Sequence, residues 1–132
     1  MQRSEILGKG LLFVSATVFV GYGLFGFFNP EIPADFGGLV IANGNGFAEI
    51  GAMYGGLQTG IGIFCLISAL KSDYYRAGLM LLAVAIGSLA LGRLYGAIMT
   101  TDTLTGYTYG ALAYEALTAA LAAIALQLHK TS

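Results

Sequence analysis

Four long apolar segments limit what this chain can fold into more than any other feature. They cover residues 9–28, 47–70, 77–100 and 107–128. Each is close to the roughly 20 residues that an α-helix needs to cross a bilayer, and each exceeds the 9 to 11 residues of a transmembrane β-strand. The sequence therefore predicts an all-α integral membrane protein, in which four helices form a single transmembrane domain over residues 1–132.

Composition agrees with a membrane location and removes several classes of function. Only 10% of the residues are charged, against about 25% in soluble domains. The net charge is −1 and the basic residues are scattered along the chain, so we do not expect a nucleic-acid partner. His129 and Cys65 are single examples of their types, which predicts no metal site, and the sequence has no phosphate loop or Ser-His-Asp motif. We therefore expect no resident cofactor and no enzymatic activity.

The loops predict how the helices are oriented. The segments 70–77 and 100–107 are short enough to place consecutive helices antiparallel, in a four-helix bundle. The side that holds both termini then collects five basic residues, namely Arg3, Lys9, Lys71, Arg76 and Lys130, whereas the opposite loops contain no Lys or Arg. By the positive-inside rule, both termini are predicted to be cytoplasmic. The longer loop over residues 29–46 is either an interfacial connector or a cap over a site.

Glycines repeat at a spacing that favours close helix packing. Three pairs stand four residues apart in the second and third apolar segments, namely Gly51 with Gly55, Gly56 with Gly60, and Gly92 with Gly96. Small residues at this spacing let two helix backbones approach closely in lipid. The pairs predict tight packing, either within the chain or against a second copy or a larger membrane complex.

Three ionisable residues, Glu49, Arg93 and Glu115, interrupt the apolar segments. A charge in hydrocarbon costs about 2.5 to 3.5 kcal/mol on insertion scales, so we expect these side chains to share one polar cluster in the outer half of the bundle. Four deeper polar side chains are expected to join them, namely Tyr54, Gln58, Tyr95 and Tyr114. Such a cluster either fixes helix register, binds a ligand or partner, or moves protons or solutes.

The stretch from Asn45 to Gln58, NGFAEIGAMYGGLQ, resembles the signature of an uncharacterised bacterial family of small four-helix membrane proteins. That family is known only as a domain of unknown function and is similar to the DoxX-like group. An Arg often follows its Glu-Ile pair, where this chain has Gly51. The resemblance implies a multi-pass protein of the bacterial inner membrane and no established substrate, although some DoxX-like proteins are associated with quinone-linked sulfur oxidation.

These observations together favour a non-enzymatic membrane protein that acts as a binding or accessory subunit. Its polar cluster would contact a partner protein, membrane lipid or quinone near the outer face. One alternative is an accessory subunit of a quinone-linked membrane oxidoreductase, with the cofactor held by another chain. A second alternative is a proton-coupled carrier or small pore, which would need a homo-oligomer because four helices enclose little volume.

Overall fold

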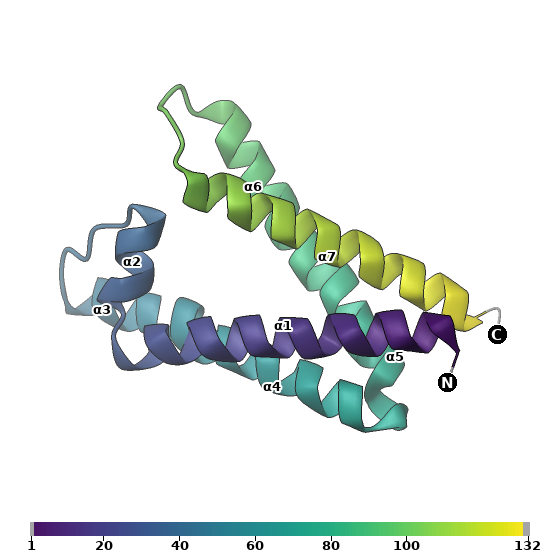
Figure 1. The fold of residues 1–132 in the computed structure, drawn as a ribbon. Helices are drawn as coiled ribbons and strands as arrows, with labels where there is room; N and C mark the ends of the chain where they lie inside the picture. Colours follow the sequence, from purple (N-terminus) through teal and green to yellow (C-terminus); the bar gives the residue numbers. More distant parts are fainter. Residues whose placement is uncertain (1, 131–132) are drawn as a thin grey trace. The chain divides into compact units, whose positions relative to one another are not determined.

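The structure is a computed structural model that describes residues 2–130, and this part is helical without strands (Figure 1). Two elements, η1 and η2, are π-helical, with wider turns than an α-helix. The elements in chain order are α1 (Arg3–Phe28), α2 (Glu31–Gly37), α3 (Gly44–Ile50), η1 (Gly51–Gly56), α4 (Leu57–Leu70), α5 (Ser72–Leu81), η2 (Leu82–Ile86), α6 (Gly87–Met99) and α7 (Gly106–Lys130).

These elements join into four long helices. The elements α3, η1 and α4 run on as one helix over Gly44–Leu70, and α5, η2 and α6 form another over Ser72–Met99. Together with α1 and α7, they give four helices of 25 to 28 residues that are long and apolar enough to cross a membrane. The prediction of an all-α chain with four helices long and apolar enough to span a membrane is thereby confirmed for the described residues.

The helices extend beyond the apolar segments at their polar ends. The first helix begins at Arg3 and the third at Ser72, several residues before the apolar stretches begin. Lys71 alone separates α4 from α5, with φ −119° and ψ 118° in the extended region. Asp73 then lies in the first turn of α5, where a negative charge interacts favourably with the helix dipole. The predicted helices began too late because a search for apolar segments does not include polar first turns of this kind.

The loop predicted over residues 29–46 contains the short helix α2. Pro30 precedes it with φ −59°, a value that suits a helix start. Gly38 ends it with φ 71°, in the left-handed region that glycine adopts without strain, and its N–H donates to the carbonyls of Ala34 and Asp35. The side chain of Asn43 then caps α3 by accepting from the N–H of Gly46 at 3.0 Å. The role of this loop as connector or cap stays a prediction.

Residue contacts divide the chain into two compact units. The terminal unit comprises Met1–Leu12 and Ser68–Ser132, and the central unit comprises Phe13–Ile67. In the terminal unit, buried residues recur every three or four positions along α5, η2 and α6, the spacing of one helix face. These residues are Leu79, Leu82, Ile86 and Ala90. The prediction of a single domain stays a prediction.

In the central unit, glycines bring α1 against the helix over Gly44–Leu70. A Cβ on Gly55 would lie 2.5 Å from the backbone N and Cα of Phe27, and a Cβ on Gly62 would lie 2.6 Å from the backbone N of Val20. A Cβ on Gly26 would lie 2.9 Å from the carbonyl oxygen of Tyr54. No side chain fits at these positions, so the backbones themselves are in contact.

Candidate functional site

Arg93 of α6 and Glu115 of α7 form a bidentate ion pair. The Nε of Arg93 donates to Oε1 of Glu115 at 2.8 Å, and the Nη2 of Arg93 donates to Oε2 at 2.9 Å. Two parallel charge-assisted hydrogen bonds of this kind combine strength with a fixed geometry. The pair therefore sets the register of α6 against α7.

The pair lies in the interface of these two helices because each partner continues a buried face. Arg93 follows Ile86 by seven residues and Ala90 by three, and both of those residues are buried. Glu115 begins a similar face on α7, which continues through three buried residues, Thr118, Ala122 and Ala125. Helix periodicity thus directs both charged side chains at the neighbouring helix.

The two side chains of the pair are mostly, but not fully, buried. The side chain of Glu115 is 7% exposed and that of Arg93 is 22% exposed. The Cζ of Arg93 lies 6.0 Å from the ring centroid of Tyr107, which is within cation–π range. The free-energy cost of taking two charges out of water is offset only when the geometry of the pair is good. The bidentate arrangement supplies this geometry. The result is a nearly buried carboxylate beside a guanidinium that is still partly accessible.

The predicted members of the polar cluster fall into both units. Arg93 and Glu115 meet in the terminal unit, whereas Glu49 is exposed on α3 in the central unit. Tyr54 and Gln58 are partly exposed and also belong to the central unit. Whether these three side chains act together with the ion pair stays a prediction.

The two remaining tyrosines of the predicted cluster are close to the pair in sequence. Tyr114 precedes Glu115 and is half-buried, while Tyr95 follows Arg93 by two residues and is exposed on α6. The ring that flanks the guanidinium belongs instead to Tyr107, which is not a member of the predicted cluster. The sequence feature that could have identified Tyr107 is its spacing of eight residues from Glu115, which places both on one face of α7.

The predicted packing glycines have different surroundings. Gly55 contacts the backbone of α1 and Gly51 lies near Pro30, whereas a Cβ on Gly56 would meet its first neighbouring atom at 4.0 Å. Three others have nothing within 4 Å of the position that a Cβ would occupy, namely Gly60, Gly92 and Gly96. The last two leave a shallow, open strip on α6. Close packing at these positions stays a prediction.

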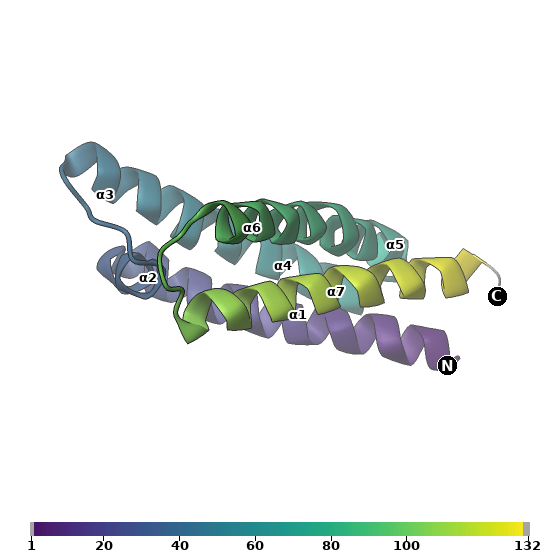
Figure 2. The ribbon, with the colours of Figure 1, turned by 90° about the horizontal axis from the view of Figure 1, so that it is seen from above.

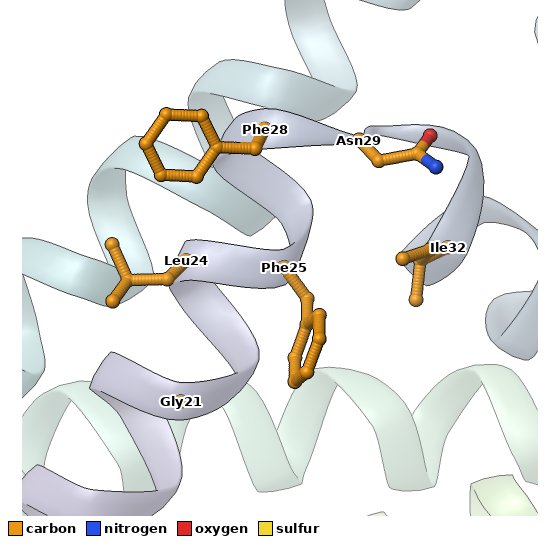
Figure 3. A pocket seen from close by; sticks show the side chains of 6 residues that line it. All are labelled: Gly21, Leu24, Phe25, Phe28, Asn29 and Ile32. Atoms are coloured by element: carbon orange, nitrogen blue, oxygen red, sulfur yellow. The ribbon is translucent and has the colours of Figure 1, made fainter.

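A groove of about 390 Å³ lies along the end of α1 and the start of α2. Figure 3 shows Phe25 of α1 and Ile32 of α2 on neighbouring sides of this space. The remaining lining residues are Gly21, Leu24, Phe28 and Asn29. The side chain of Asn29 accepts from the N–H of Glu31 at 3.2 Å. The groove therefore offers apolar contacts almost throughout.

The groups around the Arg93–Glu115 pair are of a kind that can bind another molecule. Both oxygens of Glu115 accept hydrogen bonds from Arg93, so this carboxylate is held in place by its partner. Within residues 2–130, no group of three His, Cys, Asp or Glu side chains is placed to hold a metal ion. A partly accessible guanidinium beside an aromatic ring is suited to binding.

Comparison with known proteins identifies one family. Residues 7–126 match a family model described as a domain of unknown function, DUF4345. No protein of curated function and no solved structure matches the chain at a significant level.

Proposed function

The chain belongs to the DUF4345 family, a domain of unknown function, and from this premise we propose that it is a non-enzymatic accessory subunit of a larger membrane complex. In this proposal, α6 docks on a transmembrane helix of the partner. The Arg93–Glu115 pair lies on the opposite side of α6 and holds this helix in position on α7.

One observation carries the proposal, namely the exposed side of α6. Leu91 and Tyr95 are each 68% exposed and Ile98 is 70% exposed. Their spacing of four and three residues puts them on one face, the pattern by which a helix inserts its anchors into a groove. Gly92 and Gly96 lie beside this face with open space around them, which suits close approach of another helix.

The residue types at this site also favour an interface. Tyrosine and arginine are enriched among the residues that contribute most to protein–protein binding. Here Tyr95 is exposed beside the glycines, whereas Arg93 points to α7 on the opposite side of the helix. Lipid or quinone as the bound species, or a second copy of this chain, are the other occupants that a test must separate.

We also propose that the four helices form an antiparallel bundle in the bacterial inner membrane, with both termini in the cytoplasm. The contacts within two helix pairs support this arrangement, because residue numbers rise along one helix as they fall along its neighbour. Gly26 approaches Tyr54 and Gly62 approaches Val20 in the central unit. In the terminal unit, Arg93 pairs with Glu115 and Gly87 lies near Ala119. The similarity to DoxX-like proteins remains part of the proposal.

Topology can be tested with single cysteines. Cys65 is buried, so we would replace it with serine and introduce Lys71→Cys or Asp102→Cys in separate proteins. In intact cells, a membrane-impermeant maleimide should label the cysteine at position 102 and not the one at position 71. The opposite labelling pattern, or labelling of both positions, would contradict the proposed orientation.

The accessory role can be tested by purification from the native membrane in mild detergent. We expect the full chain to elute with another membrane protein at fixed stoichiometry. Gly92→Leu should abolish this association because the new side chain fills the open strip on α6. The matched control is Gly110→Leu on α7, where a Cβ also meets nothing within 4 Å, and this variant should retain the partner.

Other outcomes of that experiment decide against the proposal. A chain that elutes only with lipid or quinone, or only with copies of itself, would reject the accessory role. Equal loss of the partner in both glycine variants would reject α6 as the docking face. A pH-dependent solute flux through liposomes that contain the purified chain alone would favour the carrier or pore.

A further inference from the structure

Three helix ends of the terminal unit meet around Tyr75. Its hydroxyl donates to the carbonyl oxygen of Ser4 at 3.4 Å, and its ring packs edge-on to the ring of His129 with centroids 5.1 Å apart. Gly8 lies directly against the same ring, with no room for a side chain. We call these four residues the Tyr75 junction. Figures 1 and 2 both show the start of α1 beside the end of α7.

Each residue of the junction is followed or preceded by a basic residue. The four adjacent pairs are Arg3 with Ser4, Gly8 with Lys9, Tyr75 with Arg76, and His129 with Lys130. Consecutive Cα atoms are about 3.8 Å apart, so the junction gathers four cationic residues into one region. Consecutive side chains of a helix point about 100° apart, which directs the basic side chains away from the contacts of the junction.

The four basic residues outnumber the acidic residue near the junction, Glu5, whose charge acts on Tyr75. Arg3, Arg76 and Lys130 are exposed and Lys9 is partly exposed. None of them makes a side-chain hydrogen bond or ion pair within residues 2–130. An anion bound at this end of the terminal unit would be attracted by all four positive charges.

Apolar side chains lie within one helical turn of these charges. Ile6 on α1, Met80 on α5 and Leu128 on α7 are all exposed, although each belongs to a helix apolar enough to cross a membrane. A ligand at this place would therefore meet cations at the ends of the helices and hydrocarbon along their sides. A phospholipid has this combination, with a charged headgroup joined to acyl chains.

We propose that the Tyr75 junction and its four basic neighbours bind the phosphate-bearing headgroup of an anionic membrane lipid. Basic residues at the ends of transmembrane helices attract anionic headgroups, and pockets between such helices bind them specifically. The junction adds specificity because it fixes three helices, and thereby their basic residues, around one point. This site is separate from the docking face on α6 and does not depend on the accessory role.

The proposal predicts selective lipid binding by the full chain in detergent. We expect native mass spectrometry to show retention of cardiolipin in preference to phosphatidylcholine, and cardiolipin to raise the thermal midpoint of unfolding. Arg76→Gln should weaken cardiolipin binding about fivefold, the effect of one basic residue near an anionic surface. Arg76→Lys keeps the charge and should retain most of the affinity.

The control is Lys71→Gln, which removes the same charge from the same end of the protein. Lys71 is exposed but is not adjacent to any residue of the junction, so its loss should weaken binding less than Arg76→Gln. Equal losses in the two variants would indicate diffuse attraction without a site and overturn the proposal. So would equal retention of cardiolipin and phosphatidylcholine, or equal stabilisation by inorganic phosphate. Titration of the wild-type chain gives these last two readouts even if a variant does not fold.

Discussion

Glu115→Leu should lower the free energy of unfolding by about 3 kcal/mol. Removal of one partner from a buried ion pair typically costs about 3 to 5 kcal/mol, because the other charge is left uncompensated. The side chain of Arg93 is 22% exposed, which places the expected loss at the lower end of this range. Both hydrogen bonds to the guanidinium disappear in this variant. The loss can be measured by reversible unfolding of the chain in mixed micelles, followed by circular dichroism.

A double-mutant cycle separates the pair from its individual side chains. Arg93→Met together with Glu115→Leu removes both charges and fills the interface with apolar atoms, so this variant should be more stable than Glu115→Leu alone. Glu49→Leu is the matched control, because Glu49 is exposed on α3 and its replacement should change stability by no more than about 0.5 kcal/mol. If the double variant loses the sum of the two single effects, the interaction between Arg93 and Glu115 contributes nothing.

Gly62→Ala should destabilise the chain by about 1 to 3 kcal/mol, the usual cost of an overpacked contact. The added Cβ would lie 2.6 Å from the backbone N of Val20 and 3.0 Å from the carbonyl oxygen of Ala16. These are backbone atoms of α1, so relief requires the two helices to separate. The loss should appear in the same micelle unfolding measurement.

Gly60→Ala provides the control for that substitution. Gly60 lies in the same helix, two residues away, and a Cβ there would meet nothing within 4 Å. Alanine has the higher helix propensity by about 1 kcal/mol, so this variant should be as stable as the wild type or slightly more stable. If Gly62→Ala is as stable as Gly60→Ala, α1 does not approach α4 as closely as the structure shows.

These two glycines show what spacing alone can predict. Gly60 belongs to a pair four residues apart, whereas Gly62 has Gln58 and Leu66 at those distances and therefore gives no such signal. Close approach depends on which face of the helix meets α1. A regular spacing on one helix does not identify that face, because the partner helix is far away in the sequence.

The helices themselves were largely predictable, because their apolar segments have the length of a bilayer crossing. The helix α2 was not, since seven residues are too few for a periodic pattern. Its boundaries nevertheless have local signals, Pro30 before the start and Gly38 after the end. Proline and glycine are typical of loops, but the conformations of these two residues depend on the folded chain.

The ion pair was predictable in part. The cost of a charge in lipid predicts that Arg93 needs a carboxylate, and the sequence offers Glu49 and Glu115. The structure gives the bidentate partner, Glu115, because both side chains continue buried faces of adjacent helices. Tyr107 was not among the predicted members of the cluster, because it lies in the first turn of α7, eight residues before Glu115.

The most direct test of the proposed accessory role is a density map of the assembly purified from its native membrane. The account predicts a transmembrane helix of another protein against Leu91, Tyr95 and Ile98 of α6, with its backbone close to Gly92 and Gly96. The Arg93–Glu115 pair should lie on the opposite side of α6, in its interface with α7. A map in which this face of α6 meets only lipid, or only a second copy of the chain, would contradict the account.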